Sequence, residues 1–125
     1  MKKRFVMLWL FGGLLACTTK NDEVKGFIPG TYVRYSENEM GRRYDTLQIE
    51  ILSACSNNYR VIRFSSVQRL LDGQAFPWER RREVWACVYD EDKQIMNEMK
   101  KGKVMSFVPE RSLLLVGSTE YKKIK

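Results

Sequence analysis

A clean two-residue alternation over residues 44–52 is the feature that most restricts the fold of this chain. The apolar positions are Leu47, Ile49 and Ile51, and the residues between them are polar. Apolar side chains at every second position predict a β-strand with one buried and one solvent-facing side. We therefore expect this segment to form a strand in a sheet that covers a core with one face only.

Other short segments rich in β-branched and aromatic residues follow at regular spacing, and turn signals separate them. One of these signals is Asp72-Gly73, which is typical of a two-residue type I′ hairpin. The remaining predicted strands cover residues 30–36, 59–70, 84–89, 94–100, 103–108 and 113–116. Seven to eight short strands predict an all-β fold, a small antiparallel barrel or meander. Closure into a barrel would also remove exposed strand edges.

Two of these segments leave an alternative open. Residues 94–100 place apolar side chains at helical spacing, but a helix this short is marginal, so we expect a strand. In residues 59–70 the faces are mixed, because Arg63 shares a face with the apolar Tyr59. A β-bulge near Ser65-Ser66 that switches the two faces is the expected explanation.

The N-terminus has the parts of a bacterial lipoprotein signal peptide. Lys2 to Arg4 are basic, residues 5–16 form an apolar or glycine run, and Leu14-Leu15-Ala16-Cys17 matches a lipobox. The run is short for a bilayer-spanning helix, which needs about 20 residues. We expect cleavage before Cys17 and acylation of this cysteine. A retained membrane helix is disfavoured because polar residues follow Cys17 directly.

The expected organisation is therefore a signal peptide over residues 1–16, a lipidated N-terminus and flexible tether over 17–26, and a β-barrel-like domain over 27–125. The tether is predicted because Thr18 to Lys25 is polar and lacks aromatic residues. The lipid predicts a protein anchored in the cell envelope, at the outer membrane. Lys20 followed by acidic residues resembles short signals for the outer leaflet, which makes surface display a further hypothesis.

Composition narrows the classes of partner. Removing residues 1–16 takes three of the 22 basic side chains and none of the 15 acidic ones, which leaves a net charge of +4. That is an ordinary mixed surface rather than a nucleic-acid-binding composition. Once Cys17 carries lipid, Cys55 and Cys87 remain. A disulfide between them is allowed outside the inner membrane, but the apolar surroundings of Cys87 fit a buried free thiol equally well.

Two resemblances carry implications. Gly30-Thr31-Tyr32 is similar to the Gly-x-Trp that opens the first strand of lipocalin-like domains, with Tyr in place of Trp. This resemblance implies a small antiparallel barrel with one mouth. A second resemblance is carried by residues 27–32, Trp85-Ala86, Tyr89-Asp90, 102–110 and 114–123. In these segments the chain resembles uncharacterised lipoproteins of Bacteroidetes-type conjugative transposons, which implies a mobile-element context and no known activity.

Catalytic and metal chemistry find little support in the sequence. The chain has no histidine, which removes the commonest general base and transition-metal ligand. Two spare cysteines without histidine do not make an ordinary zinc site, and there is no glycine-rich phosphate loop. The acidic run Asp90-Glu91-Asp92 is more typical of a solvated turn than of a calcium site. We expect no enzymatic activity, no metal and no cofactor.

The run Arg80-Arg81-Arg82 lies between Trp78 and Trp85. Arginine and aromatic rings together are typical of contacts with anionic headgroups or single-stranded nucleic acid. We favour an edge strand kept soluble by charge, because Glu79 and Glu83 flank the run. No nucleic-acid partner is expected.

Several aromatic residues would line a ligand cavity if the barrel were hollow. These candidates are Tyr59, Phe64, Trp85, Tyr89 and Phe107. In a barrel this small a filled core is the stronger prediction. The sequence thus favours a non-enzymatic envelope lipoprotein that acts through contacts with an unidentified envelope protein. This lipoprotein would be an accessory protein of a conjugative element. The alternative is a lipocalin-like carrier or sensor of a small apolar ligand.

Overall fold

The computed structural model describes residues 21–53 and 55–125. The predicted signal peptide, Cys17 and the start of the predicted tether lie outside the described residues. The described strands are β1 (Gly30–Asn38), β2 (Gly41–Ser53), β3 (Asn58–Leu71), β4 (Gln74–Ala75), β5 (Glu79–Asp90), β6 (Ile95–Glu98), β7 (Val104–Val108), β8 (Leu113–Val116) and β9 (Thr119–Lys123). A 3₁₀ turn, η1 (Pro109–Arg111), precedes β8.

Eight of these strands close into an antiparallel barrel. Their order is β2-β1-β9-β8-β7-β6-β5-β3, and pairing between β2 and β3 joins the two ends of the sheet. The two-residue strand β4 is outside the barrel and pairs only with the end of β3. The predicted all-β antiparallel barrel is confirmed.

Local predictions had mixed outcomes. Residues 94–100 contain a strand, β6, as expected. Asp72 and Gly73 have φ values of 51° and 78°, as a type I′ hairpin turn requires. The bulge expected near Ser65-Ser66 is wrong, because β3 pairs with β2 without interruption there, and the irregularity lies at Ile51–Ser53 in β2.

The barrel interior is filled by large side chains that alternate along each strand. Five of these side chains are no more than 1% exposed, namely Tyr32, Leu47, Tyr59, Met96 and Met105. A fully buried side chain of this size contributes roughly 1.5–3 kcal/mol relative to leaving it in water. The core is therefore the main source of stability, and it fills the space that a hollow barrel would offer a ligand.

Residues 21–27 form a helix that packs against the barrel. Val24 is 8% exposed and belongs to the core, and Lys25 forms an ion pair with Glu91. The Tyr32 hydroxyl donates hydrogen bonds of 2.9 Å to the carbonyls of Phe27 and Ile28. The prediction that the tether extends to residue 26 is therefore corrected, because one buried valine and an ion pair bind this segment to the folded domain.

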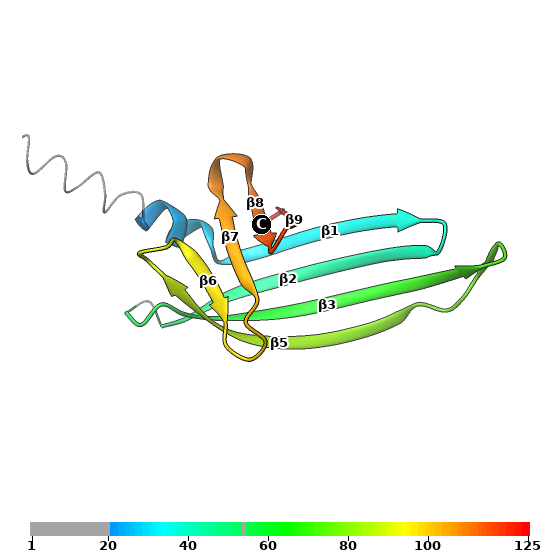
Figure 1. Cartoon of the computed structure of the whole chain (residues 1–125), viewed down its shortest axis with the longest axis horizontal. Coiled ribbons are helices and arrows are strands. Elements are labelled where there is room, and N and C mark those ends of the chain that lie inside the picture. Colours follow the sequence, from blue (N-terminus) through cyan, green and yellow to red (C-terminus); the bar gives the residue numbers. More distant parts are fainter. Residues whose placement is uncertain (1–20, 54) are drawn as a thin grey trace, which may run out of the picture.

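The strands differ greatly in length. Strand β2 has 13 residues and β6 has four, which correspond to about 44 Å and about 14 Å at 3.4 Å per residue. Strands β1, β2, β3 and β5 therefore continue past the short strands as a four-stranded sheet, opposite the end where the helix lies (Figure 1). We call residues 34–45 and 63–83, which make this sheet, the extension.

Candidate functional site: an arginine trough on the extension

The inner face of the extension continues the same face that lines the barrel core. Strand register places its side chains in cross-strand rows. From the barrel outward, the rows are Tyr32-Leu47-Arg63-Glu83, Arg34-Asp45-Ser65-Arg81, Ser36-Arg43-Val67-Glu79 and Asn38-Gly41-Arg69. Apolar side chains thus give way to arginines where the short strands end, because the opposite wall of the barrel is no longer there to cover them.

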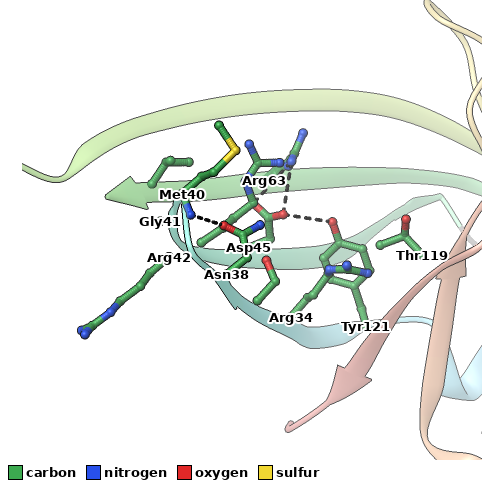
Figure 2. Close-up of a pocket in the computed structure, with 12 residues that line it drawn as sticks. Arg34, Asn38, Met40, Gly41, Arg42, Asp45, Arg63, Thr119 and Tyr121 are labelled. Atoms are coloured by element: carbon green, nitrogen blue, oxygen red, sulfur yellow. Dashed lines mark hydrogen bonds and ion pairs between the residues drawn. The ribbon is translucent and has the colours of Figure 1, made fainter. Parts of the chain in front are cut away.

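A polar network closes the core at this boundary. Nη2 of Arg63 lies 3.3 Å from both carboxylate oxygens of Asp45, and the Tyr121 hydroxyl lies 3.5 Å from the same carboxylate (Figure 2). Burial raises the pKa of Tyr121, and the neighbouring Asp45 adds to this effect, so the hydroxyl stays protonated as a donor. Asp45 is only 3% exposed. The contacts with Arg63 and Tyr121 therefore compensate for the burial of its carboxylate charge.

Glu83 joins the network from β5. Its carboxylate lies 3.8 Å from Arg63 and accepts a hydrogen bond of 3.1 Å from Nε1 of Trp85. This hydrogen bond, assisted by the charge of Arg63, holds the pKa of Glu83 below its ordinary value. Arg63 therefore lies between two carboxylates, and its Nε is nevertheless buried without a hydrogen-bond partner among the described residues.

The surface beyond the network is hollowed. One cavity of about 420 Å³ lies between β1, β2, β3 and β9, and a second of about 350 Å³ lies over β3 and β5. Both are lined by Arg43, Arg63 and Val67, so they adjoin one another. We call these two hollows together the arginine trough.

Most of the guanidinium groups in the trough lack a carboxylate partner. Arg63 pairs with Asp45 and Glu83, and Arg42, at the rim, pairs with Glu37. No other ion pair within 4 Å is found for the lining arginines among residues 21–53 and 55–125. These unpaired arginines are Arg34, Arg43, Arg69 and Arg81.

The outer face of the extension has a different chemistry. The ring centroids of Tyr35 and Tyr44 lie 4.5 Å apart, and those of Tyr44 and Trp78 lie 5.8 Å apart. All three side chains are 38% exposed or more. We call Tyr35, Tyr44 and Trp78 the aromatic face.

No family model matches this chain, and no curated protein or solved structure is significantly similar to it.

The five aromatic candidates for a cavity lining do not enclose a cavity inside the barrel, where the core is filled, as the sequence favoured. Four of them are 9% exposed or less and pack in the core, namely Tyr59, Trp85, Tyr89 and Phe107. The prediction for Phe64 is wrong, because this residue lies on the outer face of β3 and is 39% exposed. An even-numbered position in β3 points away from the barrel interior, since the expected bulge is absent.

The disulfide that was considered between Cys55 and Cys87 is not formed, and both thiols are free. Cys87 points into the core from β5, whereas Cys55 lies on an exposed turn. Burial raises the pKa of the Cys87 thiol to about 12, and the nearby charge of Glu98 adds to this effect. Cys87 is therefore an inert core residue in this fold.

The run Arg80-Arg81-Arg82 is divided between the two faces of β5. Arg81 points into the trough, while Arg80 and Arg82 lie on the outer face of β5. Over residues 79–86 the strand pairs with β3 but not with β6, as expected for an edge.

The acidic run Asp90-Glu91-Asp92 forms a tight turn, in which the Asp90 carboxylate accepts hydrogen bonds from the backbone N–H groups of Asp92 and Lys93.

Two further observations concern the described residues. None of their helical segments is long and apolar enough to cross a membrane. No three of their cysteine, aspartate and glutamate side chains come together in a group that could hold a metal ion.

The arginine trough was not predicted as a site, although the sequence contained a signal for it. Arg34 follows Tyr32 on the same strand face, and Arg63 follows Val61 in the same way. Charged residues that continue the inward-facing positions of a strand indicate that the strand is longer than the core it covers. The long strand, rather than a bulge near Ser65-Ser66, accounts for the mixing of apolar and charged residues on this face.

Proposed function

We propose that this protein is a non-enzymatic envelope lipoprotein that binds a partner protein through the extension. The observation that carries the proposal is the four-stranded sheet that continues past the closed barrel with both faces uncovered. Barrel closure needs no strands of this length. Large aromatic side chains and arginine are the residues most enriched in protein interfaces, and the extension carries both.

The position of the anchor supports this role. Cys17 precedes the first described residue, Asn21, by four positions, a distance of about 14 Å at most along the chain. An acyl group at Cys17 would hold the helical end of the barrel near the membrane. The extension, at the opposite end, would then be directed away from the membrane toward a partner (Figure 1).

The alternative function, a carrier of a small apolar ligand, has less support. The core positions that would line its cavity are occupied by tightly packed side chains such as Tyr59 and Met96. Two hollows outside the core are lined by arginines, and a third, of about 490 Å³, is lined mainly by polar residues at and near the Asp90-Glu91-Asp92 turn. An apolar ligand gains little from burial against charged groups.

The anchor is tested by Cys17→Ala, which should abolish lipid labelling and membrane association. A Cys17→Ala protein that is still acylated and fully membrane-bound would contradict the lipoprotein assignment. The resemblance to conjugative-transposon lipoproteins leads us to expect the partner among envelope proteins of such an element.

The contact role is tested by a photo-crosslinking amino acid in intact cells. We expect a residue at position 44, on the aromatic face, to crosslink one specific envelope protein, and Trp78→Ser to weaken that crosslink. The matched control is position 120, where exposed Glu120 lies on β9 of the barrel wall. Equal crosslinking from positions 44 and 120, or a bound apolar molecule in native mass spectrometry, would overturn the proposal.

A further inference from the structure

The charge balance of the trough points to an anionic ligand. Six arginines line the two hollows, against the three acidic residues Asp45, Glu79 and Glu83. Two of these acids, Asp45 and Glu83, are already paired with Arg63. The lining thus carries a surplus of positive charge, and water-exposed guanidinium groups are available to an incoming carboxylate or phosphate.

The arginines are spread along the strands rather than gathered at one point. The first cross-strand row contains Arg63, and the second contains Arg34 and Arg81. The third row contains Arg43, and the fourth contains Arg69. Successive rows are separated by two residues of strand, or about 6.8 Å. A single phosphate, which needs several donors converging on it, does not match this arrangement.

An extended peptide does match it. Alternate side chains of an extended chain point to the same side and are spaced by the same interval of about 6.8 Å. Acidic residues at every second position would therefore meet one row of the trough after another. The aromatic face lies on the opposite side of the sheet, so the trough lacks the stacking surfaces that single-stranded nucleic acid uses.

We propose that the arginine trough binds an extended acidic segment of a partner protein, with Asp or Glu at alternate positions. This inference rests on the proposed contact function and names the chemistry of the partner. Arg63, held by Asp45, forms the inner end of the trough. Arg43 and Arg69 supply the outer rows.

The test uses the full chain in non-ionic detergent and a labelled peptide of alternating Glu and Thr, followed by fluorescence anisotropy at low salt. We expect saturable binding, and a loss of about tenfold or more in affinity for Arg43→Glu/Arg69→Glu. The matched control is Arg80→Glu/Arg82→Glu, which changes the net charge equally on the outer face and should change affinity less than about twofold.

A second peptide of the same composition, with glutamates two and three positions apart in irregular order, should bind more weakly than the alternating one. Equal loss of binding in the control variant would mean non-specific attraction and would overturn the proposal. So would the absence of peptide binding, displacement of the peptide by millimolar inorganic phosphate, or stronger binding to vesicles of anionic lipid through the same arginines. If these tests fail while crosslinks from position 44 persist, only the acidic-segment inference falls.

Discussion

The Arg63 guanidinium and the Asp45 carboxylate meet at the level where the barrel core ends, with Nη2 3.3 Å from each carboxylate oxygen. The Asp45 side chain is 4% exposed and that of Arg63 is 19% exposed. This pair therefore separates two environments on one continuous sheet. Inward from it the inward-facing side chains of β1, β2 and β3 are apolar, and outward from it they form the arginine trough.

Removing Arg63 should be costly, because it leaves the Asp45 carboxylate buried without its cation. We expect Arg63→Met to lower the free energy of unfolding by about 2–4 kcal/mol. The double variant Asp45→Ala/Arg63→Met removes both charges and should recover much of this loss. Urea unfolding of Arg63→Met, Asp45→Ala and the double variant measures the coupling energy between the two side chains. Losses of stability that simply add in the double variant would contradict this prediction.

The Tyr32 hydroxyl links the N-terminal helix to the barrel. Tyr32→Phe removes the donor for two carbonyl groups, those of Phe27 and Ile28, and should cost about 1–2 kcal/mol in urea unfolding. Tyr35→Phe is the matched control, since its exposed hydroxyl donates a hydrogen bond to the Glu37 carboxylate and its loss should cost less than about 0.5 kcal/mol. Similar effects in both variants would indicate that the helix is not fixed by this contact.

Glu98 should make stability depend on pH in the acid range. Burial by itself raises the pKa of Glu98, but backbone hydrogen bonds from Lys100 and Lys101 outweigh it and hold the pKa below the ordinary value of 4.5. The unfolded chain therefore binds the proton more readily than the folded one. This contribution is fully present above pH 4.5 and is lost as the pH falls through the folded pKa.

Glu98→Gln should flatten the pH dependence of the free energy of unfolding below pH 4.5. Urea unfolding at a series of pH values measures this. The wild-type protein, measured over the same pH series, is the reference. An unaltered slope in Glu98→Gln would show that another group controls acid stability.

The two free thiols should differ sharply in reactivity. In a Cys17→Ser background, Cys55 on its exposed turn should react readily with a disulfide reagent at pH 8. With its pKa raised to about 12, Cys87 should react only after unfolding, at least about a thousandfold more slowly in the native protein. Two protected cysteines that become reactive only after reduction would instead indicate a disulfide.

The regular spacing of short apolar segments was enough to predict an antiparallel barrel. The turn at Asp72-Gly73 was also predictable, because positive φ at two successive residues is a local requirement that few residue pairs meet. Local chemistry failed for residues 21–26, where a polar composition predicted a tether. Tertiary contacts hold this segment in place, because Val24 packs into the core, Lys25 forms an ion pair with Glu91, and the Gln94 side chain donates a hydrogen bond to Asn21.

The sequence by itself therefore determined most of the segments that form strands, where several of the turns lie and, over residues 44–52, which residues share a strand face. The tertiary structure decided what each inward-facing position meets, because that depends on how far the opposite wall of the barrel reaches. Strands β6 to β9 are short, so Tyr32 is buried in the core while Arg34, two residues farther along the same face, lines an open trough. Closure is set by pairings such as β2 with β3 and β1 with β9, which join distant parts of the chain and leave no local signal.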